Sequence, residues 1–482
     1  MHFKLKLIVA ILIALPTLVK AQPANYWTNT FNTEASLLSG AVVGGNAEIT
    51  AIFYNPAGIS DVMTSRIELN ANLFSLEHKK YNNPLGKDTE MDNWFFRFYP
   101  RFASYLYPSK KFPSLNFQLA VFNRNHSETD IYDRIHFKNS DLIYKGLDEE
   151  FTGLFNLNST YDDYWGSLGI SKRINQYLSL GISINISVQT FEYLRTAKSN
   201  VIPTLISSDT IKTLSSNWST YERIKAYNWR FIGKIGVLYK KNTWSLGANL
   251  TLPSMRLFGS ADVNKTISQN NIFYQGQKIN DYYINEYPEK VYYKMQDPLS
   301  LAVGFVIKEP VTKSNFFLTL EYFHKIDSYL NIDASKKTIN NSQTGSIFSS
   351  YEFGNKSIMN FAFGYKKMLT ESLGILAGFR SDINPYKIKY RTDIWGINGY
   401  ENLNNNLFHI TGGVKFDYKK SSFIVGLQQS YGSKNMQSEL VNFSEPNAYN
   451  PETGLSLQGL RKNKSKYSYN ALGFYLGFSI SF

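Results

Sequence analysis

Strict alternation of apolar and polar residues is the feature that most constrains the fold of this chain. From Leu178 to Gln189 every second residue is aliphatic, and the residues between them are Ser, Gly, Asn or Gln. Residues 66–73 repeat the pattern with Ile, Leu and Ala. Successive side chains of a strand point to opposite faces, so this period of two predicts strands with one apolar face and one polar face.

The same template, applied to the whole chain, predicts about fourteen strands. Most are roughly 9 to 12 residues long, which is the length that a tilted strand needs to cross a membrane. An even number of antiparallel strands allows a closed barrel with both chain ends on one side. The predicted strands are residues 66–74, 97–107, 114–123, 163–171, 177–190, 227–239, 242–251, 298–307, 315–325, 357–367, 371–380, 406–417, 421–431 and 468–482.

The connections between these strands alternate between short and long. Short periplasmic turns and long external loops are typical of bacterial outer-membrane barrels, whereas a β-sandwich would not sort its loops by length. The short connections are residues 108–113, 172–176, 240–241, 309–314, 368–370 and 419–420. The long connections are residues 75–96, 124–162, 191–226, 252–297, 326–356, 381–405 and 432–466.

Both ends of the chain carry export signals. Lysines precede the apolar run Leu7–Leu15, and Val19-Lys20-Ala21 offers small residues for cleavage, so residues 1–21 are predicted to be a signal peptide. The apolar run is shorter than the roughly 20 residues of a membrane-spanning helix. The last predicted strand ends on Phe482. A terminal aromatic residue resembles the signal read by the barrel-assembly machinery, although Phe482 could instead belong to the interfacial girdle.

Composition supports the same class of protein. The chain contains 34 Tyr and 34 Phe although its mean hydropathy is −0.29, as expected of a barrel with aromatic girdles. It contains no Cys, so disulfides and thiolate metal sites are excluded. The net charge is +13. Because the chain is predicted to be exported and its charges are scattered, nucleic acid is not an expected partner. The expected partners of the positive charge are outer-membrane lipid and lipopolysaccharide or an anionic ligand, and the alternative is that most of these charges lie in solvated loops.

One segment near the front of the mature chain does not alternate. Residues 38–60, LSGAVVGGNAEITAIFYNPAGIS, are apolar and rich in glycine. Gly44, Gly45 and Gly58 permit tight backbone turns. Asn55-Pro56 is typical of a helix start, with Asn as the N-cap and Pro in the first turn. Residues 22–61 are therefore predicted to form a hatch that plugs a barrel built from residues 62–482.

A signal peptide, the Phe53-Tyr54-Asn55-Pro56-Ala57-Gly58 segment and a fourteen-strand pattern ending on Phe together resemble the FadL/TodX family of outer-membrane transporters. The resemblance covers the mature chain in architecture and residues 35–60 in recognisable motif. It implies a monomeric barrel that takes up hydrophobic compounds, such as long-chain fatty acids or aromatic hydrocarbons, past an N-terminal hatch. The residues assigned to hatch and gating are Gly44, Gly45, Asn55, Pro56, Ala57 and Gly58.

The sequence departs from the family in the strand that is expected to open the wall. Family members open the wall at a kink in the third strand, but predicted strand 114–123 contains neither Gly nor Pro. Pro100 lies in the preceding strand, where it removes a ladder hydrogen bond. It marks either a gap between the second and third strands or the end of a strand above the membrane.

Charged residues on the predicted inner face are the candidates for ligand contact. A fatty-acid carboxylate in an apolar pocket requires a cation. The assigned ligand-binding residues are Arg230, Lys234, Arg380 and His409. The alternative is that these cations form ion pairs with Glu68 or Glu321 and simply fill a polar lumen.

An enzymatic function is not expected. The sequence lacks a GxSxG motif, a phosphate-binding glycine loop and a His/Glu cluster with metal spacing, so no catalytic residue, metal or cofactor is assigned. Two other functions remain open. One is a porin for small polar solutes, and the other is a structural or adhesive surface barrel that binds a partner through its long loops.

Overall fold

The computed structural model describes most of the mature chain. The described residues are 25–204, 215–335, 338–339, 343–344, 347–387, 399–401, 403, 405–419, 421–436, 439–452 and 454–480. The predicted signal peptide, residues 22–24 and Phe482 lie outside this set.

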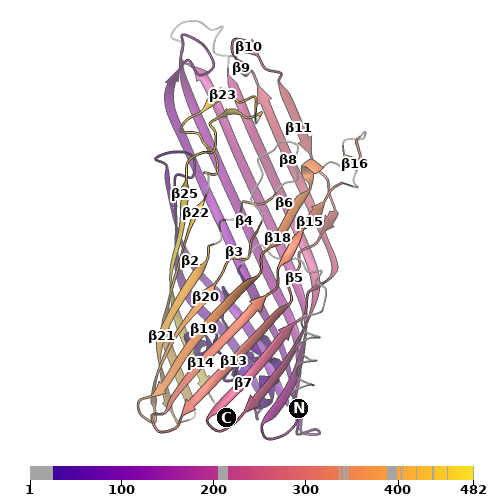
Figure 1. The fold of residues 1–482 in the computed structure, drawn as a ribbon, viewed down its shortest axis with the longest axis vertical. Helices are drawn as coiled ribbons and strands as arrows, with labels where there is room; N and C mark the ends of the chain where they lie inside the picture. The colour runs from indigo at the N-terminus through magenta and orange to yellow at the C-terminus, as the bar shows by residue number, and fades with distance from the viewer. Residues whose placement is uncertain are drawn as a thin grey trace, which may run out of the picture.

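Fourteen of the described strands form one closed antiparallel ring (Figure 1). Each pairs with the next, and the last pairs with the first through Phe74 and Phe474. The predicted antiparallel barrel is therefore confirmed, with a strand at every predicted position. The ring strands are β1 Arg66–Asn82, β2 Glu90–Pro108, β3 Leu115–Ser140, β4 Asp148–Arg173, β5 Leu178–Pro203, β6 Ser216–Lys240, β7 Trp244–Thr251, β13 Ser300–Glu309, β14 Ser314–Phe323, β19 Ile358–Met368, β20 Leu373–Asp382, β21 Leu407–Tyr418, β22 Ser421–Met436 and β25 Ser465–Ile480.

Several predicted loops are wrong, because the strands continue beyond the length that a bilayer requires. β3 and β4 each have 26 residues, and they occupy most of the segment predicted as loop 124–162. β5 and β6 do the same for loop 191–226. The predicted lengths came from membrane thickness, whereas these extensions are stabilised by a second apolar core on their inner face. That core includes Ile131, Phe151, Phe155, Leu157, Tyr193, Val201, Tyr351, Phe353, Leu440 and Phe443.

Shorter elements complete the upper wall and the loops. They are β8 Met255–Asn270, β9 Phe273–Tyr274, β10 Gln277–Lys278, β11 Tyr282–Glu286, β12 Val291–Tyr293, β15 Ile326–Asp333, β16 Thr338–Ile339, β17 Gln343–Thr344, η3 Ile347–Ser349, β18 Tyr351–Asn355, β23 Asn447–Tyr449 and β24 Ser456–Gln458. β8 pairs with β6 above the end of β7, so the wall continues upward on that side.

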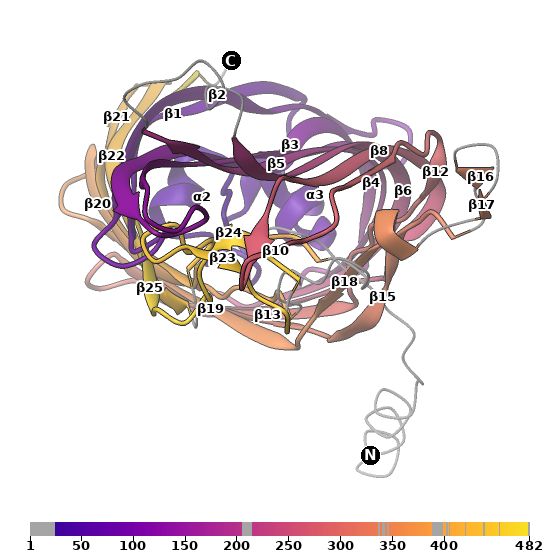
Figure 2. The same ribbon diagram turned by 90° about the horizontal axis from the view of Figure 1, so that it is seen from above.

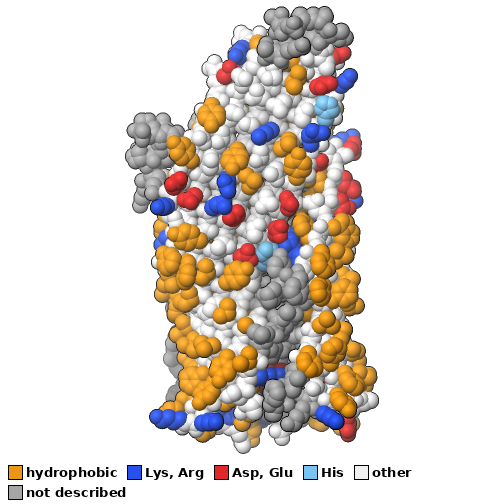
Figure 3. Space-filling view, turned by 180° about the vertical axis from the view of Figure 1, so that it is seen from behind, with side chains coloured by type: hydrophobic (Ala, Val, Ile, Leu, Met, Phe, Trp, Pro, Cys, Tyr) orange, Lys and Arg blue, Asp and Glu red, His pale blue; other side chains and the backbone are white. Residues whose placement is uncertain are grey.

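An apolar belt surrounds the lower half of the barrel. Hydrophobic side chains cover this half in Figure 3, whereas charged side chains gather above it and at the lower rim. Exposed members of the belt include Leu168, Ile184, Val237, Val303, Phe363 and Leu476. Outward apolar and inward polar residues are the expected arrangement of a transmembrane barrel. Among the described residues, no helix is long and apolar enough to cross a membrane.

The hatch lies inside the ring of strands. Figure 2 shows α2 and α3 within the lumen. Its elements are α2 Thr33–Leu37, η1 Glu48–Thr50, α3 Ala51–Tyr54 and η2 Pro56–Asp61. Nearly all of its described side chains between residues 25 and 60 are buried or half-buried, and its aliphatic residues form a core with the inner wall.

The β1–β2 hairpin is joined to its two neighbours at different heights. β2 pairs with β3 only up to Phe102 and Phe122. β1 pairs with β25 only from Phe74 and Phe474 upward. Pro100 lies inside β2, just beyond the last β2–β3 pair, and not at the end of a strand. Among the described residues, therefore, β2 and β3 have no backbone pairing above Phe102.

Candidate functional site

The hatch packs against inward-facing glycines of the barrel wall, here called the collar. A Cβ atom at each would lie 3.0 Å or less from an atom of the hatch, so a side chain would displace it. Eight of the glycines form four cross-strand pairs. The pairs are Gly181 with Gly236, Gly247 with Gly304, Gly364 with Gly378, and Gly413 with Gly426, and Gly169 and Gly477 extend the collar. Glycine weakens a strand and often marks a close backbone approach, so this signal was present in the sequence.

The Asn55-Pro56-Ala57 segment connects the hatch to itself and to the wall. Asn55 Nδ2 donates to the carbonyl oxygens of Val43 and Val237, each at 3.0 Å. Asn55 Oδ1 accepts from the N–H of Ala57 at 3.1 Å, as an N-cap does. The predicted helix start is thus confirmed as the short η2. The contacts across to β6 also hold the hatch in position.

The glycines assigned to the hatch lie at close contacts. A Cβ on Gly44 would lie 2.7 Å from the carbonyl carbon of Gly304. Gly45 has φ +137°, a conformation that favours glycine. A Cβ on Gly58 would lie 3.2 Å from that of Ala51. Together with Pro56, which lies against Gly181, these residues belong to the seat of the hatch.

Residues 25–30, here called the strap, cross the lumen above the rest of the hatch. The backbone N–H of Trp27 and the hydroxyl of Thr28 donate to the Asp382 carboxylate, both at 2.9 Å. Asn25 Nδ2 donates to the backbone carbonyls of Asp382 and Asn405. These partners are more than 350 residues away in the sequence, which is why the strap could not be predicted.

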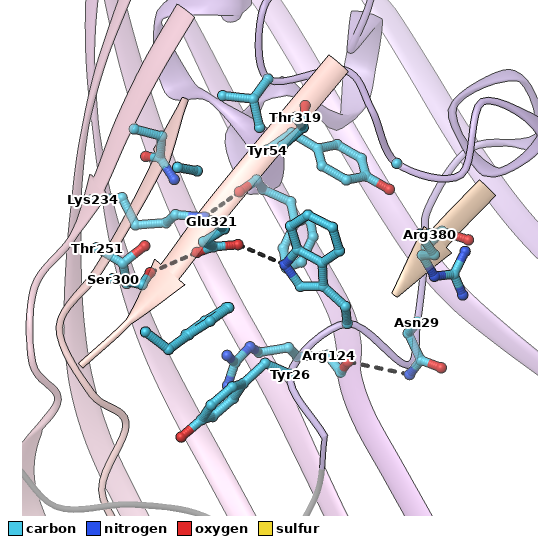
Figure 4. A pocket seen from close by; sticks show the side chains of 18 of the residues that line it. Tyr26, Asn29, Tyr54, Arg124, Lys234, Thr251, Ser300, Thr319, Glu321 and Arg380 are labelled. Carbon is cyan, nitrogen blue, oxygen red and sulfur yellow. Dashed lines mark hydrogen bonds between the residues drawn. The ribbon is translucent and has the colours of Figure 1, made fainter. Parts of the chain in front are cut away.

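An aromatic cavity of about 60 Å³ lies on one side of the strap. Figure 4 shows its side chains converging from the strap, the hatch and the barrel wall. Its apolar lining includes Tyr26, Trp27, Val43, Phe53, Tyr54, Trp165, Pro298 and Phe323. Tyr26 stacks on Phe323 with ring centroids 4.3 Å apart. The cavity is smaller than the 150 Å³ site known to hold benzene.

Five charged residues line the aromatic cavity, and they are Arg124, Lys234, Asp297, Glu321 and Arg380. Lys234 Nζ donates to the carbonyl oxygen of Phe53 and lies 4.9 Å from the centroid of the Phe53 ring. Glu321 accepts hydrogen bonds from Trp27 Nε1 and Ser300 Oγ, both at 2.6 Å. Arg380 also lines this cavity, and its guanidinium donates to the carbonyl of Thr28 at 3.2 Å. Lys234 and Arg380, assigned from the sequence, therefore meet at one site.

Arg230 lies in a buried ion network and does not line the aromatic cavity. Its guanidinium contacts Asp163 at 2.9 Å and also pairs with Asp297. Arg124 reaches Asp297 at 2.8 Å and lies 4.8 Å from the Trp165 ring centroid. The charges of the two cations and the two carboxylates cancel. This is the arrangement expected if Arg230 forms ion pairs rather than binding a ligand. The acidic partners here are Asp163 and Asp297, which the sequence did not single out.

A polar cavity of about 110 Å³ lies on the other side of the strap. Asn29 lines both cavities. His409 lines the polar one, and its Nδ1 lies 2.7 Å from Ser430 Oγ. The remaining polar lining includes Asn25, Thr28, Ser75, Glu77, Lys79, Arg97, Asn125, His126, Glu128, Asn405 and Gln428. The four residues assigned to ligand binding from the sequence thus lie in three places. Lys234 and Arg380 line the aromatic cavity, His409 lines the polar cavity, and Arg230 lies in the ion network.

Side chains bridge the wall where β2 and β3 are not paired. Arg97 on β2 contacts Glu128 on β3 and also Glu77 on β1, the latter at 3.3 Å. Lys79 donates to the carbonyl oxygen of Glu128. Asn93 Nδ2 donates to the carbonyl of Asp130 at 2.6 Å. These bridges, here called the β2–β3 seam, replace backbone hydrogen bonds with side-chain contacts.

Among the described residues, no group of three or more His, Cys, Asp or Glu could hold a metal ion.

Comparison with solved structures gives the same fold. A crystal structure of a Pseudomonas aeruginosa FadL homologue aligns with a TM-score of 0.51 and 13% identity, covering 94% of this chain and 99% of that one. The P. putida toluene transporter TodX aligns with a TM-score of 0.49 and 12% identity, over 94% and 98% of the two chains. No family model and no curated protein sequence matched the chain. At this identity the likeness establishes a shared barrel fold.

Proposed function

We propose that this chain is an outer-membrane channel of the FadL/TodX type, through which hydrophobic small molecules pass a resident hatch. The observation that carries the proposal is the aromatic cavity, enclosed by the strap, the hatch and the wall of a closed barrel. Ligand sites are typically concave, mostly apolar and equipped with a few polar groups that fix orientation. The shared fold with a FadL homologue supports this reading.

The proposed cellular context follows from the architecture. The apolar belt meets the outer-membrane lipid, the charged upper part faces lipopolysaccharide, and the barrel-assembly machinery inserts the chain. The protein acts as a monomer and as a channel rather than an enzyme. A signal peptide at residues 1–21 and a domain division near Asp61 belong to the same proposal, and the described hatch ends at Asp61 before β1 begins at Arg66.

We propose that ligand leaves sideways through the β2–β3 seam. Backbone pairing stops at Phe102, and Pro100 has no N–H with which to continue it. In the part of the wall that the structure describes, side chains bridge the gap above this point. At the collar, by contrast, the lower hatch packs closely against most of the wall. A route through the seam requires movement of side chains and the strap, whereas a downward route requires the whole hatch to leave its seat.

Binding and transport by the purified protein test the proposal. Toluene and decanoate are the probes, since the first is a neutral aromatic and the second carries a carboxylate. We expect at least one to bind in the lumen, with fatty-acid binding weakened by Lys234→Met. A lumen that conducts small polar solutes without binding either probe would instead support a porin. Deleting residues 22–60 is expected to raise passive conductance, and unchanged conductance would contradict a plugging hatch.

A further inference from the structure

Several of the buried polar atoms that lack a partner among the described residues belong to side chains that line the polar cavity. Asn25 Oδ1, Asn125 Oδ1, His409 Nε2 and both amide atoms of Asn405 have no hydrogen-bond partner among the described residues. All four side chains line this cavity, and each residue is at most 3% exposed. A buried polar group without a partner costs about 1–3 kcal/mol. Such a cluster therefore indicates a place where polar molecules bind.

The orientation of two of these amides is fixed by their other contacts. Asn25 Nδ2 donates to two backbone carbonyls, at 3.0 and 2.8 Å. Asn125 Nδ2 donates to the carbonyl of Asn25 at 2.6 Å. Their Oδ1 atoms are consequently acceptors without a donor. With the amide oxygen of Asn405, the cavity offers three acceptors, and the Asn405 nitrogen adds a donor.

This set of groups selects a ligand that both donates and accepts hydrogen bonds. A carboxylate has no hydrogen to give, so it would leave the three amide oxygens unpaired. The formal charges of the lining also cancel, because Lys79 and Arg97 are matched by Glu77 and Glu128. Burial of a charged group therefore lacks a counterion. Hydroxyl groups, which donate and accept without charge, satisfy both conditions.

We propose that the polar cavity is a second luminal binding site that takes an uncharged group bearing two or more hydroxyls. Its volume of about 110 Å³ is well above the roughly 10–15 Å³ that a single water molecule requires, so it has room for a larger group such as one of glycerol size. The hydroxyls belong either to a free polyol or to the head of an amphiphile. In the second case the apolar tail occupies the aromatic cavity across the strap, and that case rests on the proposed function.

Asn405→Leu is the sharpest variant, because it removes polar atoms that bind nothing else in the described protein. The backbone carbonyl of Asn405, which accepts from Asn25, is unchanged. The amide therefore makes no hydrogen bond that stabilises the described fold. We expect the thermal stability of Asn405→Leu to equal or exceed that of the wild type. Ser199→Ala is the matched control. It removes a fully buried hydroxyl without a partner that lines neither cavity.

The experiment measures binding of monodecanoylglycerol, decanoate, glycerol and toluene to the full protein in lipid nanodiscs. We expect Asn405→Leu to weaken monodecanoylglycerol about tenfold, as loss of two neutral hydrogen bonds implies, and to leave toluene unchanged. Ser199→Ala should alter neither. Glycerol that binds with the same sensitivity to Asn405→Leu identifies a free polyol as the source. Monodecanoylglycerol binding without glycerol binding identifies an amphiphile.

Two outcomes would overturn the proposal. One is equal affinity of wild type and Asn405→Leu for both hydroxyl-bearing probes, which would mean that the cavity holds only water. The other is an equal loss for toluene and monodecanoylglycerol, which would mean a general disturbance of the lumen. Failure of the proposed function is separate, since it would appear as absence of toluene, decanoate and monodecanoylglycerol binding while glycerol binding persisted.

Discussion

Gly44 of the hatch and Gly304 of the wall face each other without room for a methyl group on either. A Cβ on Gly44 would lie 2.7 Å from the carbonyl carbon of Gly304, and a Cβ on Gly304 would overlap the backbone of Val43 and Gly44. The contact joins backbone to backbone, so no side-chain rotation can relieve it. The hatch and the wall are therefore in direct backbone contact at this point.

Gly304→Ala is therefore expected to loosen the hatch. The new methyl group overpacks a rigid contact, which typically costs about 1–3 kcal/mol, and raises the conductance of the barrel in planar bilayers as the hatch shifts. Gly412→Ala is the control, because a Cβ on Gly412 has no atom within 4 Å. Equal conductance and thermal stability for the two variants would show that the collar does not retain the hatch.

The ring strands could be predicted from sequence because the membrane imposes a pattern that does not depend on distant contacts. One face must be apolar, the other polar, and the length is set by the bilayer. That rule located all of the ring strands, β5 and β25 among them. It failed above the belt, where β3 to β6 continue to Ser140, Asp148, Pro203 and Ser216 and the inner face packs against a core formed by loops.

The candidate site, like the barrel, could be predicted only in part from the sequence. Asn55-Pro56 was recognisable because a helix start is encoded locally. The strap was not, since its partners Asp382 and Asn405 are brought to Asn25 only when the barrel closes. Inward-facing cations could be identified by alternation, but their partners could not. Hence Arg230 and Lys234 looked equivalent in sequence, although one lies among carboxylates and the other in the aromatic cavity.

Asn55→Ala should release the hatch from β6. It removes hydrogen bonds to Val43, Val237 and Ala57, and at about 0.5–1.5 kcal/mol each the loss is about 1.5–4.5 kcal/mol. Limited proteolysis of the hatch in folded protein measures this. Asn55→Asp is the informative comparison, because a carboxylate still accepts from Ala57 but repels the two carbonyl oxygens. A wild-type cleavage rate for Asn55→Asp would show that the two carbonyl contacts contribute nothing.

Arg230→Ala and Lys234→Met are expected to have different effects. Removing Arg230 leaves Asp163 and Asp297 with Arg124 alone, and a buried carboxylate that loses its partner costs about 3–5 kcal/mol, so the thermal midpoint falls. Lys234→Met removes the charge and keeps an unbranched apolar side chain that is one atom shorter. We expect it to weaken decanoate binding and to spare toluene. Decanoate binding lost in Arg230→Ala at unchanged stability would instead make Arg230 a ligand contact.

The external sheet should gain stability as the pH rises above 8. Lys265, on the part of β8 that extends beyond the apolar belt, lies 3.9 Å from Glu222, and burial lowers the pKa of Lys265 to about 8. An unfolded lysine titrates near 10.4. Between these values the unfolded state binds more protons, so stability increases with pH. Hydrogen exchange of β8 amides, corrected for intrinsic rates, is the measurement.

A variant with Lys265→Met and Glu222→Gln provides the control for that titration. It removes both charges, so β8 protection should change little between pH 7 and pH 10. The difference in protection free energy between wild type and this variant should therefore vary across that range. A constant difference would mean that Lys265 keeps the same protonation state in the folded and unfolded protein.

The seam provides the last test, since it separates a lateral exit from a route past the hatch. Arg97→Met together with Lys79→Met removes the contacts to the side chain and the carbonyl oxygen of Glu128, while the β1–β2 ladder is unaffected. We expect bound toluene to pass into nanodisc lipid faster. Lys80→Met is the control, because Lys80 pairs with Glu90 within the hairpin and bridges no gap. If the double variant released toluene at the wild-type rate while Gly304→Ala accelerated release, ligand would leave past the hatch, and the collar would be the barrier that controls transport.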